Sequence, residues 1–219
     1  MAAYSWSADK GLSQAAFLPS SRYAGALVGW PAQGRAFLLG GFSGKERTPV
    51  CDLLGYNGKE NSWRPLAPPP SSFGALAGLA DACPFTGTIY AAALQRRRLQ
   101  VYNPDVDRWD SEAACLPAAD GLWSLACLDS LVYAGCRQTC YLLDPRDGRW
   151  SGAGELQLAR GGGGRLLALD GRLWAFGGVL QGADRQPELL DERMLRWRLS
   201  DSQLQLSCNL YTATVPLSV

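Results

Sequence analysis

The stretch at residues 35–63, RAFLLGGFSGKERTPVCDLLGYNGKENSW, contains the pattern that decides the fold. It begins as an apolar strand that ends in Gly40-Gly41 and passes through a polar loop. A second strand then ends in Tyr56-Asn57, and Trp63 follows after a short turn. Apolar runs bounded by Gly, Asn and Pro are typical of short strands in a small antiparallel sheet. Further copies of the pattern would indicate a repeat protein.

The pattern recurs three times downstream. After Trp63, the tryptophans Trp109, Trp150 and Trp197 follow at intervals of 46, 41 and 47 residues. Each ends one of the stretches YNGKENSW, YNPDVDRW, LDPRDGRW and LDERMLRW, and two further apolar strands precede each stretch. Periods of about 40–50 residues are typical of propellers, in which each unit is one four-stranded sheet. We expect the tryptophans to lie buried between neighbouring sheets, because one sheet cannot cover its own apolar faces.

Each unit has a pair of small residues at the end of its second strand. The first and fourth units have Gly40-Gly41 and Gly177-Gly178, whereas the second has Ala92-Ala93. Glycine suits a position where backbone approaches backbone or takes a positive φ. The alanines indicate that a positive φ is not required in the second unit.

The sequence predicts an all-β propeller of four-stranded antiparallel blades over residues 1–219. The units are expected at about 23–72, 73–120, 121–162 and 163–208. Trp6 matches the tryptophan of a preceding unit, so residues 1–22 are expected to end that unit with its last strand. Residues 209–215, NLYTATV, are expected to begin another unit. Either further blades of a longer protein complete the ring, or Trp6 and residues 209–215 share an atypical fifth blade.

Composition excludes several classes of function. The chain has no histidine, which excludes Ser-His-Asp and Cys-His nucleophile systems and metal sites with histidine ligands. The net charge of +1 is unlike the strongly basic balance of nucleic-acid-binding proteins. The apolar window at residues 73–94 contains Asp81 and Pro84, which argues against a membrane span. Seven cysteines and an N-terminus unlike a signal peptide predict a cytoplasmic location, with the nucleus as the alternative.

The repeated units resemble the kelch family, whose repeats combine a Gly-Gly after the second strand, a Tyr-Asn or Tyr-Asp and a spaced tryptophan. The resemblance covers nearly the whole chain, is strongest in the first unit, and rests on spacing and Tyr or Trp residues in the second and third. It is closest to the kelch propellers of BTB–kelch proteins. It implies a substrate-recognition module of a cullin-RING ubiquitin ligase, with no catalytic residue, metal or cofactor. A cytoskeletal, actin-associated scaffold and a kelch-fold enzyme or specifier protein remain alternatives.

The resemblance also implies where a partner binds. In kelch adaptors the connections between the second and third strands, and between successive blades, gather on one face and hold partner peptides. Arginines outnumber lysines 18 to 3, and arginine suits the capture of carboxylates, so an acidic peptide is the expected partner. The alternative is that these arginines are only solvated loop residues. The matching positions are Arg22, Tyr23, Arg47, Ser72, Phe73, Arg96, Arg97, Arg98, Trp123, Arg137, Arg160 and Arg185.

Two other short motifs allow a chemical reading. Cys136 and Cys140 bracket a loop with Arg137, which could lower a neighbouring thiol pKa and make a redox-sensing cysteine. The alternative is two reduced thiols near strand ends. The glycines at residues 161–164 lack the GxxxxGK[ST] pattern of a phosphate loop and are expected to form a connection between blades.

Overall fold

The computed structural model describes residues 3–7, 11–23, 25–30, 33–43, 46, 48–70, 79–83, 86–93, 98–116, 122–161, 164–178 and 186–200. Within these ranges the fold is an all-β propeller, as the sequence predicts, with four four-stranded antiparallel sheets. Within the same ranges, no helix has the length and apolar character needed to cross a membrane.

The strands of each sheet follow the order of the chain, so we number the sheets as blades 1–4 and letter their strands A–D. Blade 1 contains β3 (Ala26–Trp30), β4 (Arg35–Leu39), β7 (Leu53–Asn57) and β8 (Ser62–Pro65). Blade 2 contains β9 (Leu79–Cys83), β10 (Thr88–Ala93), β11 (Arg98–Asn103) and β12 (Arg108–Cys115). Blade 3 contains β13 (Leu122–Leu128), β14 (Leu131–Cys136), β15 (Thr139–Asp144) and β16 (Arg149–Glu155). Blade 4 contains β17 (Arg165–Leu169), β18 (Arg172–Phe176), β19 (Glu188–Asp191) and β20 (Arg196–Leu199).

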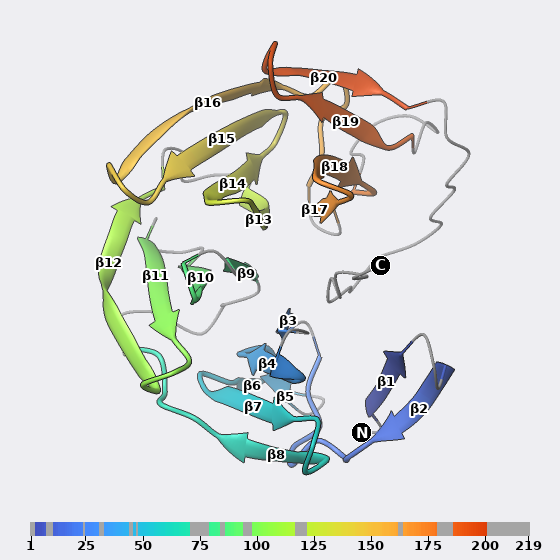
Figure 1. Ribbon diagram of the computed structural model, residues 1–219, viewed down its shortest axis with the longest axis vertical. Coiled ribbons are helices and arrows are strands. Elements are labelled where there is room, and N and C mark those ends of the chain that lie inside the picture. Colours follow the sequence, from blue (N-terminus) through green and yellow to red (C-terminus); the bar gives the residue numbers. More distant parts are fainter. Residues whose placement is uncertain are drawn as a thin grey trace.

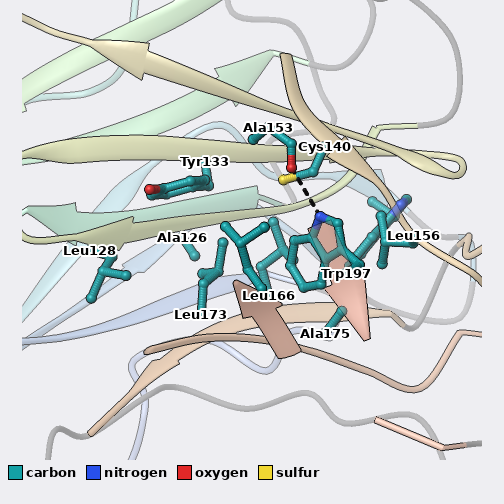
Figure 2. Packing of buried hydrophobic residues seen from close by; sticks show 12 residues of the cluster. Ala126, Leu128, Tyr133, Cys140, Ala153, Leu156, Leu166, Leu173, Ala175 and Trp197 are labelled. Carbon is teal, nitrogen blue, oxygen red and sulfur yellow. Dashed lines mark hydrogen bonds between the residues drawn. The ribbon is translucent and has the colours of Figure 1, made fainter. Parts of the chain in front are cut away.

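The blades stand side by side around a common centre (Figure 1). Their A strands β3, β9, β13 and β17 lie innermost, and successive A strands are neighbours. The D strands lie at the periphery. Three hydrophobic clusters fill the spaces between successive blades, because each sheet has apolar residues on the faces that meet. Figure 2 shows the cluster between blades 3 and 4, where Leu166, Leu173 and Trp197 meet Ala126 and Cys140.

The tryptophan pattern predicts the pairing of the outer strands correctly. Each tryptophan lies directly opposite the strand residue seven positions earlier; the pairs are Tyr56 with Trp63, Tyr102 with Trp109, Leu143 with Trp150 and Leu190 with Trp197. The predicted packing between blades is confirmed for Trp109, Trp150 and Trp197, which belong to or pack against the three clusters. The predicted burial is complete only for Trp197, whereas Trp63, Trp109 and Trp150 are partly exposed.

Polar bonds that the sequence pattern did not reveal also join the blades. The indole Nε1 of Trp109 donates to the carbonyl of Ala67, just beyond the D strand of blade 1, at 2.8 Å. The backbone N of Ala67 donates to Asp107 Oδ1 at 2.8 Å, and the hydroxyl of Tyr102 donates to the same oxygen at 2.6 Å. Asp107 has a φ of 49°, a conformation that Asp and Asn adopt more readily than most residues. The tyrosine and the turn residue therefore act together as a clamp between blades.

Blade 1 repeats this clamp on the segment that precedes it. Trp63 Nε1 donates to Ala16 O at 3.1 Å, while Ala16 N and the Tyr56 hydroxyl both bond Asn61 Oδ1 at 2.7 and 2.9 Å. Ala16 thus takes the place that Ala67 has between blades 1 and 2. Blade 4 keeps only the indole bond, from Trp197 to Ala153 O at 3.1 Å (Figure 2).

The segment before blade 1 differs from the prediction. It forms a hairpin of β1 (Ala3–Ser7) and β2 (Gly11–Ala15). Trp6 lies in β1, opposite Leu12 of β2. It is therefore not in the strand that comes directly before blade 1, where the sequence pattern predicts it. Ala16 follows β2 as Ala67 follows β8, so β2 corresponds to a D strand and β1 to a C strand, although the hairpin is a two-stranded sheet. The prediction failed because the residues that reverse the chain come after Trp6. Residues 209–215 lie outside the described residues.

The glycine pairs match their expected role. Gly40 and Gly41 have φ values of 63° and 101°, and Gly177 and Gly178 have 58° and 65°. A Cβ on Gly41 would lie 2.7 Å from the carbonyl oxygen of Tyr23, so backbone does approach backbone there. Ala92, in strand β10 of blade 2, does not take a positive φ.

Candidate interaction face

One end of each blade brings two kinds of connection together. Because the four strands alternate in direction, the B–C turn and the D–A connection lie at the same end of the sheet. Hydrogen bonds join them directly: Tyr23 N donates to Phe42 O at 3.0 Å in blade 1, and Arg160 N donates to Arg137 O at 3.2 Å beside blade 3. We call this end of the propeller the loop face.

Arg22 lies beneath the loop face and not on it. Its side chain is buried, and its guanidinium forms a forked ion pair with Asp52, with Nη2 3.1 Å from Oδ2. Nη2 also donates to Ser20 Oγ at 2.7 Å, and Nη1 donates to the carbonyl of Gly40 at 3.4 Å. Arg22 therefore ties the connection before blade 1 to the glycine pair and to the start of its C strand.

Arg160 has the corresponding role in blade 4. Arg160 and Glu188 are both fully buried, with Nη2 3.0 Å from Oε1. The guanidinium also donates to the carbonyls of Gly177 and Gln186, at 2.7 and 2.9 Å. Burial lowers the pKa of Arg160, and the carboxylate of Glu188 opposes that shift. Both arginines thus bond the first glycine of a Gly-Gly pair, and this inward position differs from the exposed rim that the sequence suggested.

Glu188 extends this network back to blade 3. Its carboxylate accepts the backbone N–H groups of Gln157 and Leu158 at 2.6 and 3.2 Å. A buried carboxylate is stable when a cation and several donors satisfy it. The pair therefore links the segment after blade 3 to the C strand of blade 4.

Tyr23 and Phe42 form an aromatic pair on the loop face. Tyr23 is 44% exposed, Phe42 is partly exposed, and their rings stack with centroids 5.8 Å apart. Their backbones exchange two hydrogen bonds of 3.0 and 2.9 Å, so both residues are held in place. Phe42 also begins β5 (Phe42–Ser43), which pairs with β6 (Thr48–Pro49) in the B–C connection of blade 1. Sequence reasoning selected Tyr23 but missed Phe42, because only the pairing across the connection brings them together.

Trp123 is a core residue. It is buried, its Nε1 donates to the carbonyl of Arg137 at 3.0 Å, and its ring covers Gly135 and Gly164. A Cβ on Gly135 would lie 2.6 Å from the ring, so the small residue there makes room for the indole. Arg137, by contrast, is exposed in the two-residue turn between β14 and β15, with a φ of 53°.

The other predicted site residues are not described, or only their backbone is described, so their prediction stays untested. Arg98 begins β11, and its side chain is outside the description. The remaining positions lie outside the described residues; they are Arg47, Ser72, Phe73, Arg96, Arg97 and Arg185.

Cys136 and Cys140 do not form the facing pair that redox chemistry requires. Cys136 lies opposite Thr139 in the β14–β15 ladder, and facing residues share a side of the sheet. Because Cys140 is the next residue after Thr139, it points to the other side. Burial raises the pKa of the Cys136 thiol to about 11 and raises that of Cys140 further. Arg137 therefore does not create a low-pKa thiol here.

Gly161 and Gly164, the two described glycines of this run, lie in the connection between blades 3 and 4, as expected. Gly161 N donates to Gly178 O at 2.8 Å, and Gly164 N donates to Gly161 O at 2.9 Å. In the described part of the chain, no group of three or more Cys, Asp and Glu residues could hold a metal ion.

No protein-family model matches this sequence, and no curated protein matches it. The kelch resemblance rests on the residue pattern alone and stays a prediction.

Proposed function

We propose that this propeller is a protein-interaction module that binds a peptide of its partner on the loop face. The observation that carries the proposal is the exposed Tyr23–Phe42 pair. Aromatic residues with restricted freedom are typical anchors of protein interfaces. The blades of a propeller are arranged radially, so the connections at one end of the blades form a common face.

The surroundings of the pair support this role. Two backbone hydrogen bonds hold the aromatic residues together, and the buried Arg22, which is paired with Asp52, fixes the segment beside them. A partner therefore meets a surface that is already ordered, which reduces the entropy lost on binding. The role proposed is binding without catalysis, in the cytoplasm or the nucleus.

Partner capture from cells tests the proposal. Tagged wild-type chain is compared with the double variant Tyr23→Ser/Phe42→Ser by proximity labelling and quantitative affinity purification. The matched control is Val106→Ser/Met194→Ser, which removes two exposed apolar side chains from the C–D turns at the other end of the blades. We expect the first variant to lose its specific partners by about tenfold or more, as for the loss of an interface anchor. The control should keep them.

The fold of each variant is checked by its melting temperature and circular dichroism. If a folded Tyr23→Ser/Phe42→Ser variant keeps the wild-type partners, the loop-face proposal is wrong. If the variant unfolds, the single substitution Tyr23→Ser decides, because this residue is 44% exposed and contributes less to the core.

The finer proposal, drawn from the resemblance to BTB–kelch propellers, is that the partner is an acidic substrate of a cullin-RING ubiquitin ligase. Charge reversal at Arg96, Arg97 and Arg98 tests the acidic character. Purified complexes are then assayed for cullins and for ubiquitin transfer to the captured protein. If the partners still bind after the charge reversal, the partner peptide is not acidic. If the complexes contain no cullin, the ligase role is wrong.

A further inference from the structure

Arg137 stands out among the residues of the loop face because its backbone is in a conformation that its residue type disfavours. Its φ is 53°, in the left-handed region. In the described residues, four of the six non-glycine residues with positive φ are Asn or Asp, the types that tolerate it best. The other two are Arg137 and Leu195.

Leu195 has a packing reason for its place that Arg137 lacks. The carbonyl oxygen of Leu195 lies against Gly154 of blade 3, where a Cβ would come within 2.0 Å. The side chain of Arg137, in contrast, is exposed and packs no core. An Asn or Gly at position 137 would fit the backbone better, and the core gains nothing from the arginine side chain there.

The backbone of Arg137 is held from several sides. Its carbonyl oxygen accepts Trp123 Nε1 at 3.0 Å and Arg160 N at 3.2 Å. The adjacent Gln138 carbonyl accepts Leu156 N at 2.7 Å. The turn is thus fixed to the A strand of its own blade and to the connection that leads to blade 4. The guanidinium therefore projects from a rigid base.

The charge of Arg137 is uncompensated within the described part of the chain. Three exposed arginines of the C–D hairpins form ion pairs with Asp110, Asp144 and Asp191. No described carboxylate lies within 4.0 Å of the Arg137 guanidinium, so its donors are open to a ligand from outside. A guanidinium offers a planar fork that matches a carboxylate.

We propose that Arg137 is the anchoring residue for a carboxylate of the partner peptide, held ready by its strained, clamped turn. This inference rests on the proposed function and assigns the acidic preference to one residue. Its partner is an Asp or Glu side chain in a protein.

The proposal is tested by fluorescence anisotropy, which measures the binding of a labelled decaglutamate peptide. Decaglutamine is the uncharged control peptide. The key variant is Arg137→Asn, which keeps a residue suited to positive φ and removes the guanidinium. Its control is Arg193→Asn, an exposed arginine in the C–D turn of blade 4 with an ordinary φ. We expect Arg137→Asn to bind decaglutamate about tenfold more weakly than wild type, as for one lost charge-assisted contact. Arg193→Asn should change binding by less than about twofold.

The melting temperature supplies a second test. If Arg137 had a purely structural role, Arg137→Asn would lower the melting temperature. Arg137→Asn should melt at the wild-type temperature or up to about 4 °C higher, because backbone strain is relieved. A melting temperature lowered by more than about 2 °C would overturn the strain argument. Failure of wild type to bind decaglutamate, or equal binding by Arg137→Asn, would overturn the anchoring role. Displacement by inorganic phosphate at constant ionic strength would assign the site to phosphate instead.

The two proposals can fail separately. If Tyr23→Ser/Phe42→Ser loses its cellular partners while Arg137→Asn binds decaglutamate as wild type does, the interaction module is supported. The anchoring role of Arg137 is then wrong. Retention of all partners by a folded Tyr23→Ser/Phe42→Ser variant contradicts the loop-face proposal, whatever the result for Arg137→Asn.

Discussion

The buried arginines differ in the exposure of their acidic partners, and this difference predicts unequal energetic roles. Removing Arg160 leaves the fully buried Glu188 carboxylate without its cation, so we expect Arg160→Met to lower the free energy of unfolding by about 3–5 kcal/mol. Asp52 has a 41% exposed side chain that water can solvate, so Arg22→Met should cost about 1–3 kcal/mol. Urea unfolding at neutral pH measures both values. Equal costs would contradict the burial argument.

Buried thiols predict a loss of stability in alkaline solution. The pKa of Cys136 rises from 9.0 to about 11 because burial disfavours the thiolate. A raised native pKa means that the stabilising contribution is complete below pH 9 and is lost as the pH rises toward 11. We expect the free energy of unfolding to fall by up to about 2–3 kcal/mol over this range through Cys136. Cys136→Ala should flatten that part of the pH profile, measured by urea unfolding, and an unchanged slope would contradict the prediction.

At the scale of residues, the sequence predicted correctly that several positions matter. It did not predict whether their side chains are buried or which residues they contact. Arg22 and Arg160 were selected as rim residues because of their place in the repeat. Their acidic partners lie 30 and 28 residues away, and nothing local shows that these side chains meet inside the fold. Phe42 was missed for the same reason, since its contact with Tyr23 crosses a whole hairpin.

At the scale of elements, the glycine pairs yield a test that separates strain from crowding. Gly178 has a φ of 65°, and a Cβ there would lie 2.3 Å from the backbone N of Gly164. We expect Gly178→Ala to lower the free energy of unfolding by about 2–4 kcal/mol, from both backbone strain and overpacking. Gly171 has nearly the same φ, 66°, with nothing within 4 Å, so Gly171→Ala should cost only about 1–2 kcal/mol. Denaturant unfolding compares them, and similar losses would show that crowding contributes nothing.

Strand pairing was the most predictable element of the structure. The distance of seven residues to the tryptophan defines a short hairpin, and the register follows from it. The clamps made by Asn61 and Asp107 were not predictable, because Asn and Asp are common in turns of every kind and their positions in the sequence do not reveal a bond to the neighbouring blade. Their bonds to Ala16 and Ala67 appear only when neighbouring blades are placed side by side.

At the scale of the whole molecule, separate clusters between blades predict independent effects of distant substitutions. Asp107→Ala removes a clamp between blades 1 and 2, and Trp197→Phe removes the indole bond between blades 3 and 4. Each should cost about 1–2 kcal/mol. Because the two sites share no neighbour in the clusters, the double variant should equal the sum within about 0.5 kcal/mol. A larger discrepancy in equilibrium unfolding would indicate coupling across the ring.

The propeller as a whole was predictable because its repeat is written four times in the sequence. The hairpin before blade 1 was predicted less well, since one tryptophan without its companion residues does not define a strand position. The connections that form the loop face differ in length and have no repeated sequence pattern. The pairing of Tyr23 with Phe42 and the exposed turn at Arg137 therefore became visible only in the structure.

The short β5–β6 extension of blade 1 has a practical consequence for protein engineering. Val50 N donates to Gly41 O at 2.9 Å, which closes the extension at its base, below the pairing of Ser43 with Thr48. A foreign sequence grafted between residues 43 and 48 would leave this closure and the register of the blade in place. The propeller is therefore suited to displaying grafted loops beside a fixed aromatic surface, with the length of the insert as a free variable.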